Sequence, residues 1–216
     1  MIDTPLSYDD LDAEAVFLRP LLRRPPWRTY GDKEDTGIHA LFRRYRPGTA
    51  PHTLSPELRG AVWGGTAFVP DALKDNDAGL IRAVDHAALV LHLLARGPAA
   101  SPNGLDFGKG CSKAGLSDTR FTRLMGTPQP RRLEALSRVM QRLEKAGTPL
   151  RWVAEDAEMQ SRPWNAHLPS TDEVWPMLNF LFGYEPDPSI ARWAAGFFGT
   201  RDAEATEPAV VTDRAT

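Results

Sequence analysis

Apolar residues recur every three or four positions along most of the chain, as on one face of an α-helix. No segment shows a convincing strand-like alternation, and prolines and glycines separate the apolar runs. The most apolar run, residues 77–96, ends at Gly97 and predicts the central, most buried helix. The pattern therefore predicts an all-α protein of about eight to nine helices.

Residues that cap helices predict several helix ends. Candidate N-caps are Ser7, Ser55, Ser117 and a capping box of Ser170 with Glu173. A helix starting at Pro130 is expected to stop at Gly147, because a left-handed C-cap favours glycine. Residues 97–108 are expected to form a loop and residues 150–160 another helix. The polar residues after about Thr200 are expected to be disordered.

Composition is that of an ordinary soluble globular protein, since 42% of the 216 residues are hydrophobic and 25% are charged. The single cysteine excludes an internal disulfide framework and fits a reducing cytoplasm. The acidic N-terminus lacks the basic-then-apolar order of a secretory signal, and the run "AALVLHLLA" is too short to span a bilayer. We therefore expect a cytoplasmic protein without a membrane partner.

Charge is distributed unevenly along the chain. The whole sequence carries a net charge of −2, but residues 106–151 contain ten Lys and Arg against four Asp and Glu, a net charge of +6. On a helical wheel the apolar residues of 130–146 gather on one side and four cations on the other, namely Arg131, Arg138, Arg142 and Lys145. A second basic cluster, "FRRYRPG", contains Arg43, Arg44 and Arg46.

Two interpretations of this basic stretch are open. Helix surfaces are normally charged, and Glu134 can pair with Arg138 one turn away, so the cations could be an idle solvated face. An idle face usually mixes signs, however, and arginine offers a planar fork of donors that suits phosphate. The predominance of arginine favours a phosphate-binding surface.

The order of motifs from Gly108 to Met159 resembles the small subunit of the type I-E CRISPR Cascade complex, the CasB family. That family has a short basic turn, then "S-x-x-R-F-x-R-L", a helix with "L-x-R-L/V-x-R-L", and "P-L-D-W". Here these elements are Gly108-Lys109-Gly110, Ser117 to Leu124, Leu136 to Leu143 and Pro149 to Trp152. The segments "HALFRRYRPG" and "SIARWAAGFFG" are similar to its N-terminal and closing segments, so the resemblance covers residues 37–200 unevenly.

The chain also departs from the family. Gly126 stands where the family often has another arginine, which removes one expected phosphate contact. Residues 1–35 and 160–188 have no counterpart in the family's pattern.

The resemblance implies a non-enzymatic, all-α subunit of two packed helical bundles, which occurs as a homodimer beside other Cascade subunits. It would hold the backbone of the CRISPR RNA–target DNA heteroduplex and the displaced strand, while guide pairing reads the sequence. By the resemblance, the contacts would be made by Arg43, Arg44, Lys109, Arg120, Arg123 and Arg138. Charge and the helical wheel add Lys113, Arg131 and Arg142.

The corresponding domain organisation has four parts. Residues 1–36 would be an N-terminal extension with one helix, and residues 37–105 an N-terminal helical bundle. Residues 106–200 would form the basic C-terminal bundle, and residues 201–216 a disordered tail. The alternative function is a helical protein-interaction adaptor whose basic face meets an acidic partner. The acid-rich stretch 152–191 could itself dock a basic partner or simply be solvated.

No catalytic, cofactor or metal site is expected. The run G-x-x-x-G-K-G at 104–110 is one residue short of a phosphate loop and lacks the Ser or Thr after its lysine. Cys111 is expected to be a buried or incidental thiol. His86 and His92 are six residues apart, which does not fit the i,i+4 spacing of a zinc pair, so both are expected in the core. Tryptophans are expected as core anchors, with Trp164 open as a base-stacking residue.

Overall fold

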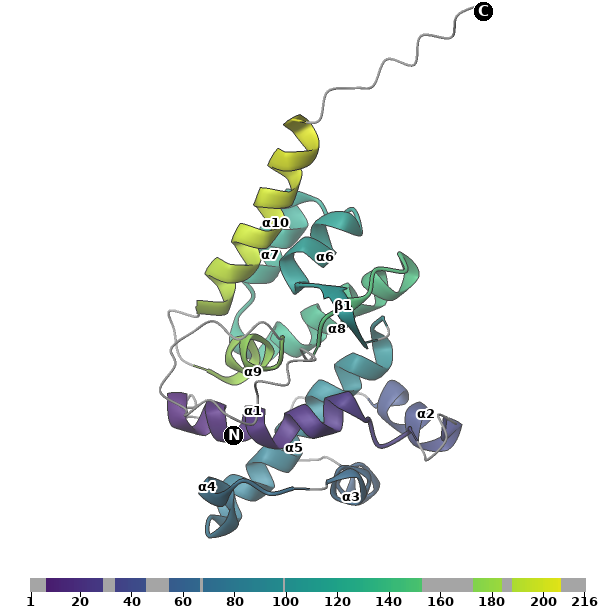
Figure 1. Cartoon of the computed structure of the whole chain (residues 1–216), viewed down its shortest axis with the longest axis vertical. Helices are drawn as coiled ribbons and strands as arrows, with labels where there is room; N and C mark the ends of the chain where they lie inside the picture. Colours follow the sequence, from purple (N-terminus) through teal and green to yellow (C-terminus); the bar gives the residue numbers. More distant parts are fainter. Residues whose placement is uncertain are drawn as a thin grey trace, which may run out of the picture.

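The computed structural model describes residues 7–28, 34–45, 55–66, 68–98, 100–152, 173–183 and 188–206 (Figure 1). Within them it contains ten α-helices and one short strand, which confirms the all-α class and is close to the predicted helix count. The elements are α1 (Tyr8–Arg23), α2 (Thr36–Arg44), α3 (Pro56–Gly65), α4 (Asp71–Lys74), α5 (Asp77–Arg96), β1 (Ala100–Leu105), α6 (Phe107–Lys113), α7 (Asp118–Met125), α8 (Gln129–Lys145), α9 (Val174–Phe182) and α10 (Pro188–Thr206).

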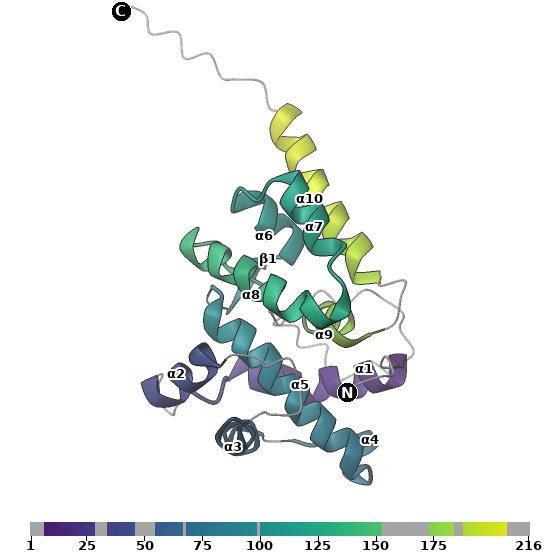
Figure 2. The same cartoon turned by 180° about the vertical axis from the view of Figure 1, so that it is seen from behind.

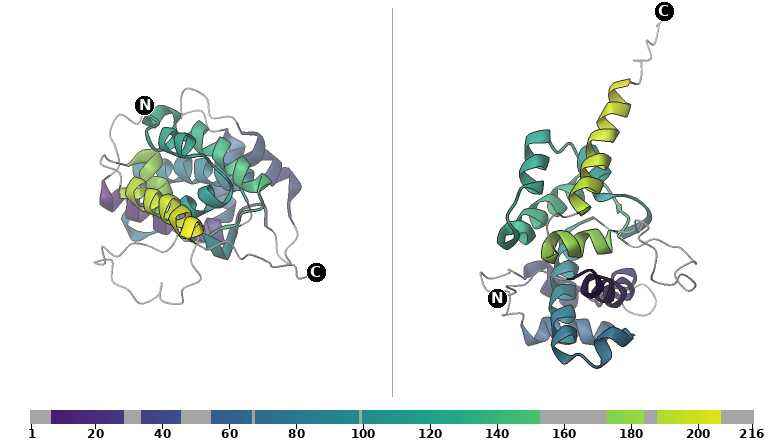
Figure 3. Two further views of the ribbon diagram at one scale, coloured as in Figure 1. Left: turned by 90° about the horizontal axis from the view of Figure 1, so that it is seen from above. Right: turned by 90° about the vertical axis from the view of Figure 1, so that its left-hand side faces the viewer.

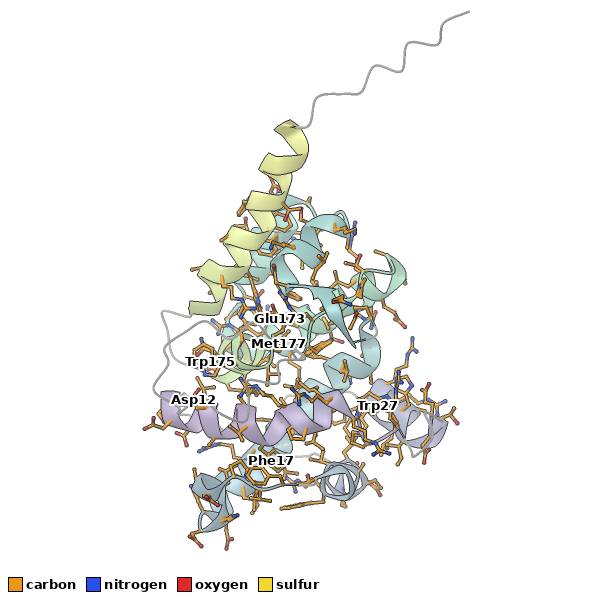
Figure 4. The ribbon with its side chains drawn as sticks, in the orientation of Figure 1. Asp12, Phe17, Trp27, Glu173, Trp175 and Met177 are labelled. Carbon is orange, nitrogen blue, oxygen red and sulfur yellow. The ribbon has the colours of Figure 1, made fainter. Side chains whose placement is uncertain are left out.

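The helices form a lower and an upper group along the long axis of the molecule (Figures 1 and 3). In the lower group α5 packs against α1, α2, α3 and α4. In the upper group α10 packs along α6 and α9, and α8 lies against α9 and also against α5. The buried apolar residues of both groups form one contiguous cluster, to which α1 contributes Phe17 and α9 contributes Met177 (Figure 4).

The central helix is α5, as its apolar sequence predicts. The nine-residue run "AALVLHLLA" was expected to be too short to span a bilayer. The whole of α5, however, is long and apolar enough to do so, judged by its 20 residues and their composition alone. Within this protein, 72% of its most apolar stretch is buried. Because helices of both groups cover it, its hydrophobicity is accounted for by the core.

The glycines of 104–110 let elements approach closely. A Cβ on Gly108 would lie 2.0 Å from the carbonyl oxygen of Trp193, and one on Gly104 would lie 2.4 Å from the backbone of Leu150. The Asp106 side chain accepts a hydrogen bond from the Lys109 amide and so caps α6. Tight packing of α6 and β1 therefore explains this glycine run without a bound phosphate.

Residues 100–105 form a strand, β1, where the sequence indicates a loop. Leu105 pairs in parallel with Leu150: its amide donates to Pro149, and its carbonyl accepts from Arg151, both at 3.0 Å. The expected helix at 150–160 is therefore wrong for 150–152, and the rest of it lies outside the described residues. A pairing between segments 45 residues apart leaves no local sequence signal.

Helix caps agree with the sequence at three predicted positions. Ser7 forms a capping box with Asp10, Ser55 caps α3, and Gly147 has the expected positive φ, 62°. Ser117 occupies the N-cap of α7 but makes no side-chain cap hydrogen bond. The capping box at α9 is wrong, because the Glu173 carboxylate is bonded to α10 instead. Its predicted partner, Ser170, lies outside the described residues.

The last helix is longer than its apolar pattern indicates. α10 continues to Thr206, whereas residues after about Thr200 were expected to be disordered. The remainder of the predicted tail, 207–216, lies outside the described residues, as do Arg46 and Trp164.

Candidate nucleic-acid interface

Helices α7 and α8 form one outer side of the upper group, in front of α10 and α9 in Figure 2. On α7, Phe121 and Leu124 are buried, whereas Arg120 and Arg123 are exposed. This eight-residue helix thus turns its apolar side to the core and its arginines to solvent, as the three-residue spacing predicts.

On α8 the predicted apolar side is also confirmed. Leu136, Met140 and Leu143 are fully buried, and the cations Arg131, Arg138 and Lys145 are exposed. These three side chains extend the basic surface of α7 along α8. They belong to the predicted stripe.

Arg142 departs from that stripe. It is half-buried, and its guanidinium donates to the carbonyl oxygens of Gly115, at 2.9 Å, and Ala114, at 3.4 Å. These carbonyls belong to the corner between α6 and α7, where Gly115 has a φ of 68°. A helical wheel cannot reveal this contact, because the corner comes from another part of the chain. Part of the donor capacity of Arg142 is therefore used within the protein.

A further arginine of the basic stretch lies in the core. Arg132 is 3% exposed, donates to the carbonyl oxygens of Thr127 and Phe180, and lies 4.8 Å from the centre of the Phe180 ring. It connects α8 to α9. The sequence count of ten cations therefore overstates the charge that faces solvent.

Three predicted contact residues are exposed but form ion pairs. Arg138 pairs with Glu134, as its spacing predicts, and Lys109 pairs with Asp106 at 3.3 Å. Arg43 of α2 pairs with Glu144 of α8 at 3.1 Å. Exposed pairs contribute only about 0–1 kcal/mol each, so a phosphate could compete for these cations.

The pair of Arg43 and Glu144 brings the two predicted basic clusters together. Beside it lies an open, polar depression of about 260 Å³ where α2, α5 and α8 end, lined by Arg43, Arg96, Gln141, Glu144 and Lys145. These clusters are about 100 residues apart in the sequence. The depression gathers three cations and one acid at helix C-termini, where cations offset the helix dipoles.

Within the two predicted basic clusters, six exposed cations have no ion-pair partner among the residues that the structure describes. They are Arg44, Lys113, Arg120, Arg123, Arg131 and Lys145. Five of them were predicted from the sequence as contact residues, and Lys145 appeared only in the helical-wheel stripe. Unpaired, exposed arginines keep all five N–H donors for an anionic ligand.

The other candidate chemistry lies in the core. Cys111 is buried, and burial raises the pKa of its thiol, with Glu173 and Asp106 adding to the effect. His86 and His92 are buried, and each bonds through Nδ1, to Glu14 at 2.6 Å and to the Phe42 carbonyl at 2.8 Å. Burial also lowers the pKa of His92. Within the described residues no group of three His, Cys, Asp or Glu could hold a metal ion.

Two buried acids were missed by the sequence reading. Glu14 accepts from Arg82 at 2.8 Å as well as from His86, and Asp10 also accepts from Arg82, at 2.6 Å. Glu173 is fully buried between α9, α10 and α6 (Figure 4). No signal in one sequence separates such acids from surface acids, because their partners come from distant helices.

Comparison with protein-family models, with curated protein sequences and with solved structures finds no match to this chain. The case for a function therefore rests on the residues of this chain.

Proposed function

We propose that this protein is a non-catalytic, nucleic-acid-binding small subunit of a type I-E-like CRISPR surveillance complex. In this role it stabilises the CRISPR RNA–target DNA heteroduplex and the displaced strand through backbone contacts, in antiviral defence in the cytoplasm. It acts as a homodimer beside the other Cascade subunits. The observation that carries the nucleic-acid part is the set of exposed, unpaired cations on α6, α7 and α8 of an otherwise slightly acidic chain.

The two parts of this proposal have different support. The Cascade assignment depends on the order of sequence motifs from Gly108 to Met159. The binding mode depends on charge: Arg120, Arg123 and Arg131 are exposed without an acidic partner in the described residues. Such cations bind phosphates regardless of the bases, which suits a complex whose guide RNA reads the sequence.

A double charge reversal distinguishes this role from that of an adaptor. For the variant that combines Arg120→Glu and Arg131→Glu, we expect normal folding and normal assembly with the other Cascade subunits. Capture of target DNA by the assembled complex should weaken about tenfold or more, equally for unrelated targets. Pull-down of the subunits and a mobility-shift titration measure the two properties.

The control reverses the same number of charges in the lower group of helices, with Arg28→Glu and Lys74→Glu. Both residues are exposed, and neither belongs to the basic stretch of α6, α7 and α8. It should leave target capture unchanged. If the reversal on α7 and α8 abolishes subunit binding while nucleic-acid affinity persists, the protein is an adaptor. Unchanged target capture would contradict the scaffold role.

A further inference from the structure

The depression where α2, α5 and α8 end holds more hydrogen-bond donors than its own side chains use. Its lining combines three cations with a single acid, Glu144. Arg43 donates to this carboxylate at 3.1 Å through one nitrogen only, Nη2. Arg96 donates to the side-chain oxygen of Gln141 through Nη2 and, at 2.7 Å, through Nε. The remaining N–H groups of both arginines and the ammonium of Lys145 have no partner among the described residues.

The helix ends around the depression do not need these cations as caps. The Leu143 carbonyl near the end of α8 accepts from the Thr148 amide at 3.1 Å. The Ala95 carbonyl at the end of α5 accepts from Nε2 of His39 at 3.3 Å. The guanidinium groups that line the depression donate to side chains instead. Helix capping therefore leaves their free donors unexplained.

The depression lies at the end of the basic stripe on α8. Arg131, Arg138 and Lys145 follow one another at intervals of seven residues, about two helical turns, so they share one side of the helix. All three are exposed, and Lys145 also lines the depression. An extended anion that follows the stripe along α8 therefore reaches the depression.

We infer that this depression binds a phosphate group, held by Arg43, Arg96 and Lys145. The planar forks of two guanidinium groups match the oxygens of a phosphate. The volume of about 260 Å³ is below the roughly 300–1,000 Å³ of sites for drug-sized molecules, so it suits a small anionic group. Glu144 repels this group and competes with it for Arg43, which keeps the affinity low. The inference rests on the proposed function only in naming a nucleic-acid strand as the source of the phosphate.

Inorganic phosphate tests the depression without nucleic acid. The full chain is titrated with phosphate at constant ionic strength, and the side-chain amide signal of Gln141 is followed by NMR. The signal should shift and saturate in the wild type, and acetate, a carboxylate, should shift it less. Glu144→Gln frees Arg43 and should bind phosphate about 3- to 10-fold more tightly. Arg96→Gln should lose the response.

Oligothymidylate of about 20 nucleotides tests whether the phosphate belongs to a strand. Glu144→Gln should strengthen its binding about 3- to 10-fold, and Arg96→Gln should weaken it by a similar factor. The salt slope of Arg96→Gln should be shallower by about 0.7, because one phosphate contact is lost. Since Glu144→Gln gains affinity, the test does not depend on how well Arg96→Gln folds.

Asp71→Asn is the matched control. It also replaces a carboxylate by an amide and frees a cation, Lys74, but on α4 in the lower group. It should bind both probes like the wild type. An equal gain of affinity in this control would show that net charge, and not the depression, determines binding.

The two probes separate the inference from the proposed function. If acetate shifts the Gln141 signal as strongly as phosphate, the depression takes carboxylates and the inference is wrong. If Glu144→Gln and Arg96→Gln change neither probe while Arg120→Glu with Arg131→Glu weakens oligothymidylate, the inference is wrong and the proposed function stands. If phosphate binds at the depression but oligothymidylate does not bind at all, the phosphate site stands and the proposed function fails.

Discussion

Glu173 places an acidic group inside the upper group of helices. Its carboxylate is fully buried and accepts hydrogen bonds from Arg192, at 2.9 Å, and from Trp193 Nε1, at 2.7 Å. Burial raises its pKa to about 7, despite the opposing effects of Arg192, the Trp193 N–H and the Phe107 backbone. The pKa of this buried carboxyl therefore lies close to neutral pH, so its ionisation state changes in that range.

The raised pKa makes stability depend on pH. Because the carboxyl binds its proton more tightly in the folded than in the unfolded chain, its stabilising effect is present below its ordinary pKa of 4.5 and is lost as the pH rises through about 7. Relative to the wild type, Glu173→Gln should gain roughly 2–3 kcal/mol of unfolding free energy between about pH 5 and 8.

Urea unfolding of both proteins across this range measures the difference. Other titrating groups cancel, since they are shared by the two chains. A difference that is constant with pH would show that Glu173 stays ionised in the folded protein.

The sequence predicts which side of a helix a residue occupies better than it predicts what lies across from it. Arg120, Arg123 and Arg131 are exposed as their spacing indicates. Arg142 and Glu173 differ, because carbonyls of another corner and donors of α10 decide their environment. Periodicity is local, whereas these partners are distant in the chain.

At the scale of elements, Arg142 joins α8 to the corner between α6 and α7. Its guanidinium donates to the carbonyl oxygens of Ala114 and Gly115, just after the end of α6. Carbonyls at the end of a helix lack a partner within the helix, so these bonds satisfy acceptors that would otherwise need another donor. Arg142→Ala should therefore lower the unfolding free energy by about 1–2 kcal/mol, whereas the exposed Arg138→Ala should change it by less than about 0.5 kcal/mol.

Chemical denaturation of the two alanine variants provides the comparison, with Arg138 as the matched control on the same helix. Equal costs at the two positions would mean that the bonds from Arg142 to the corner do not contribute to folding.

Helix positions followed from caps and apolar spacing, as for α1 after Ser7 and α8 before Gly147. The strand β1 and the segment paired with it did not, because Leu105 and Leu150 pair across 45 residues. The close crossing of α6 and α10 at Gly108 was equally hidden. A glycine that permits contact looks in the sequence like a glycine that permits a turn.

At the scale of the whole molecule, a slightly acidic chain presents unpaired cations on α6, α7 and α8. One apolar core joins both helix groups, so these cations are held on a single body. The ion pair of Arg43 with Glu144 links the basic end of α2 to α8 across the two groups. The all-α class was predictable from the sequence, and so were most of the exposed cations. The local pair of Arg138 with Glu134 was predictable from its spacing. The pair of Arg43 with Glu144 and the bonds of Arg142 were not, because they depend on how α2, α6 and α8 meet.

The salt dependence of binding tests the central claim most directly. Affinity of the purified chain for unrelated single strands should be measured from about 0.05 to 0.3 M salt. If four to five of the unpaired cations meet phosphates, the logarithm of affinity should fall linearly with the logarithm of salt, with a slope near −3 for every sequence. Binding that is insensitive to salt, or restricted to one base sequence, would contradict a backbone-holding role.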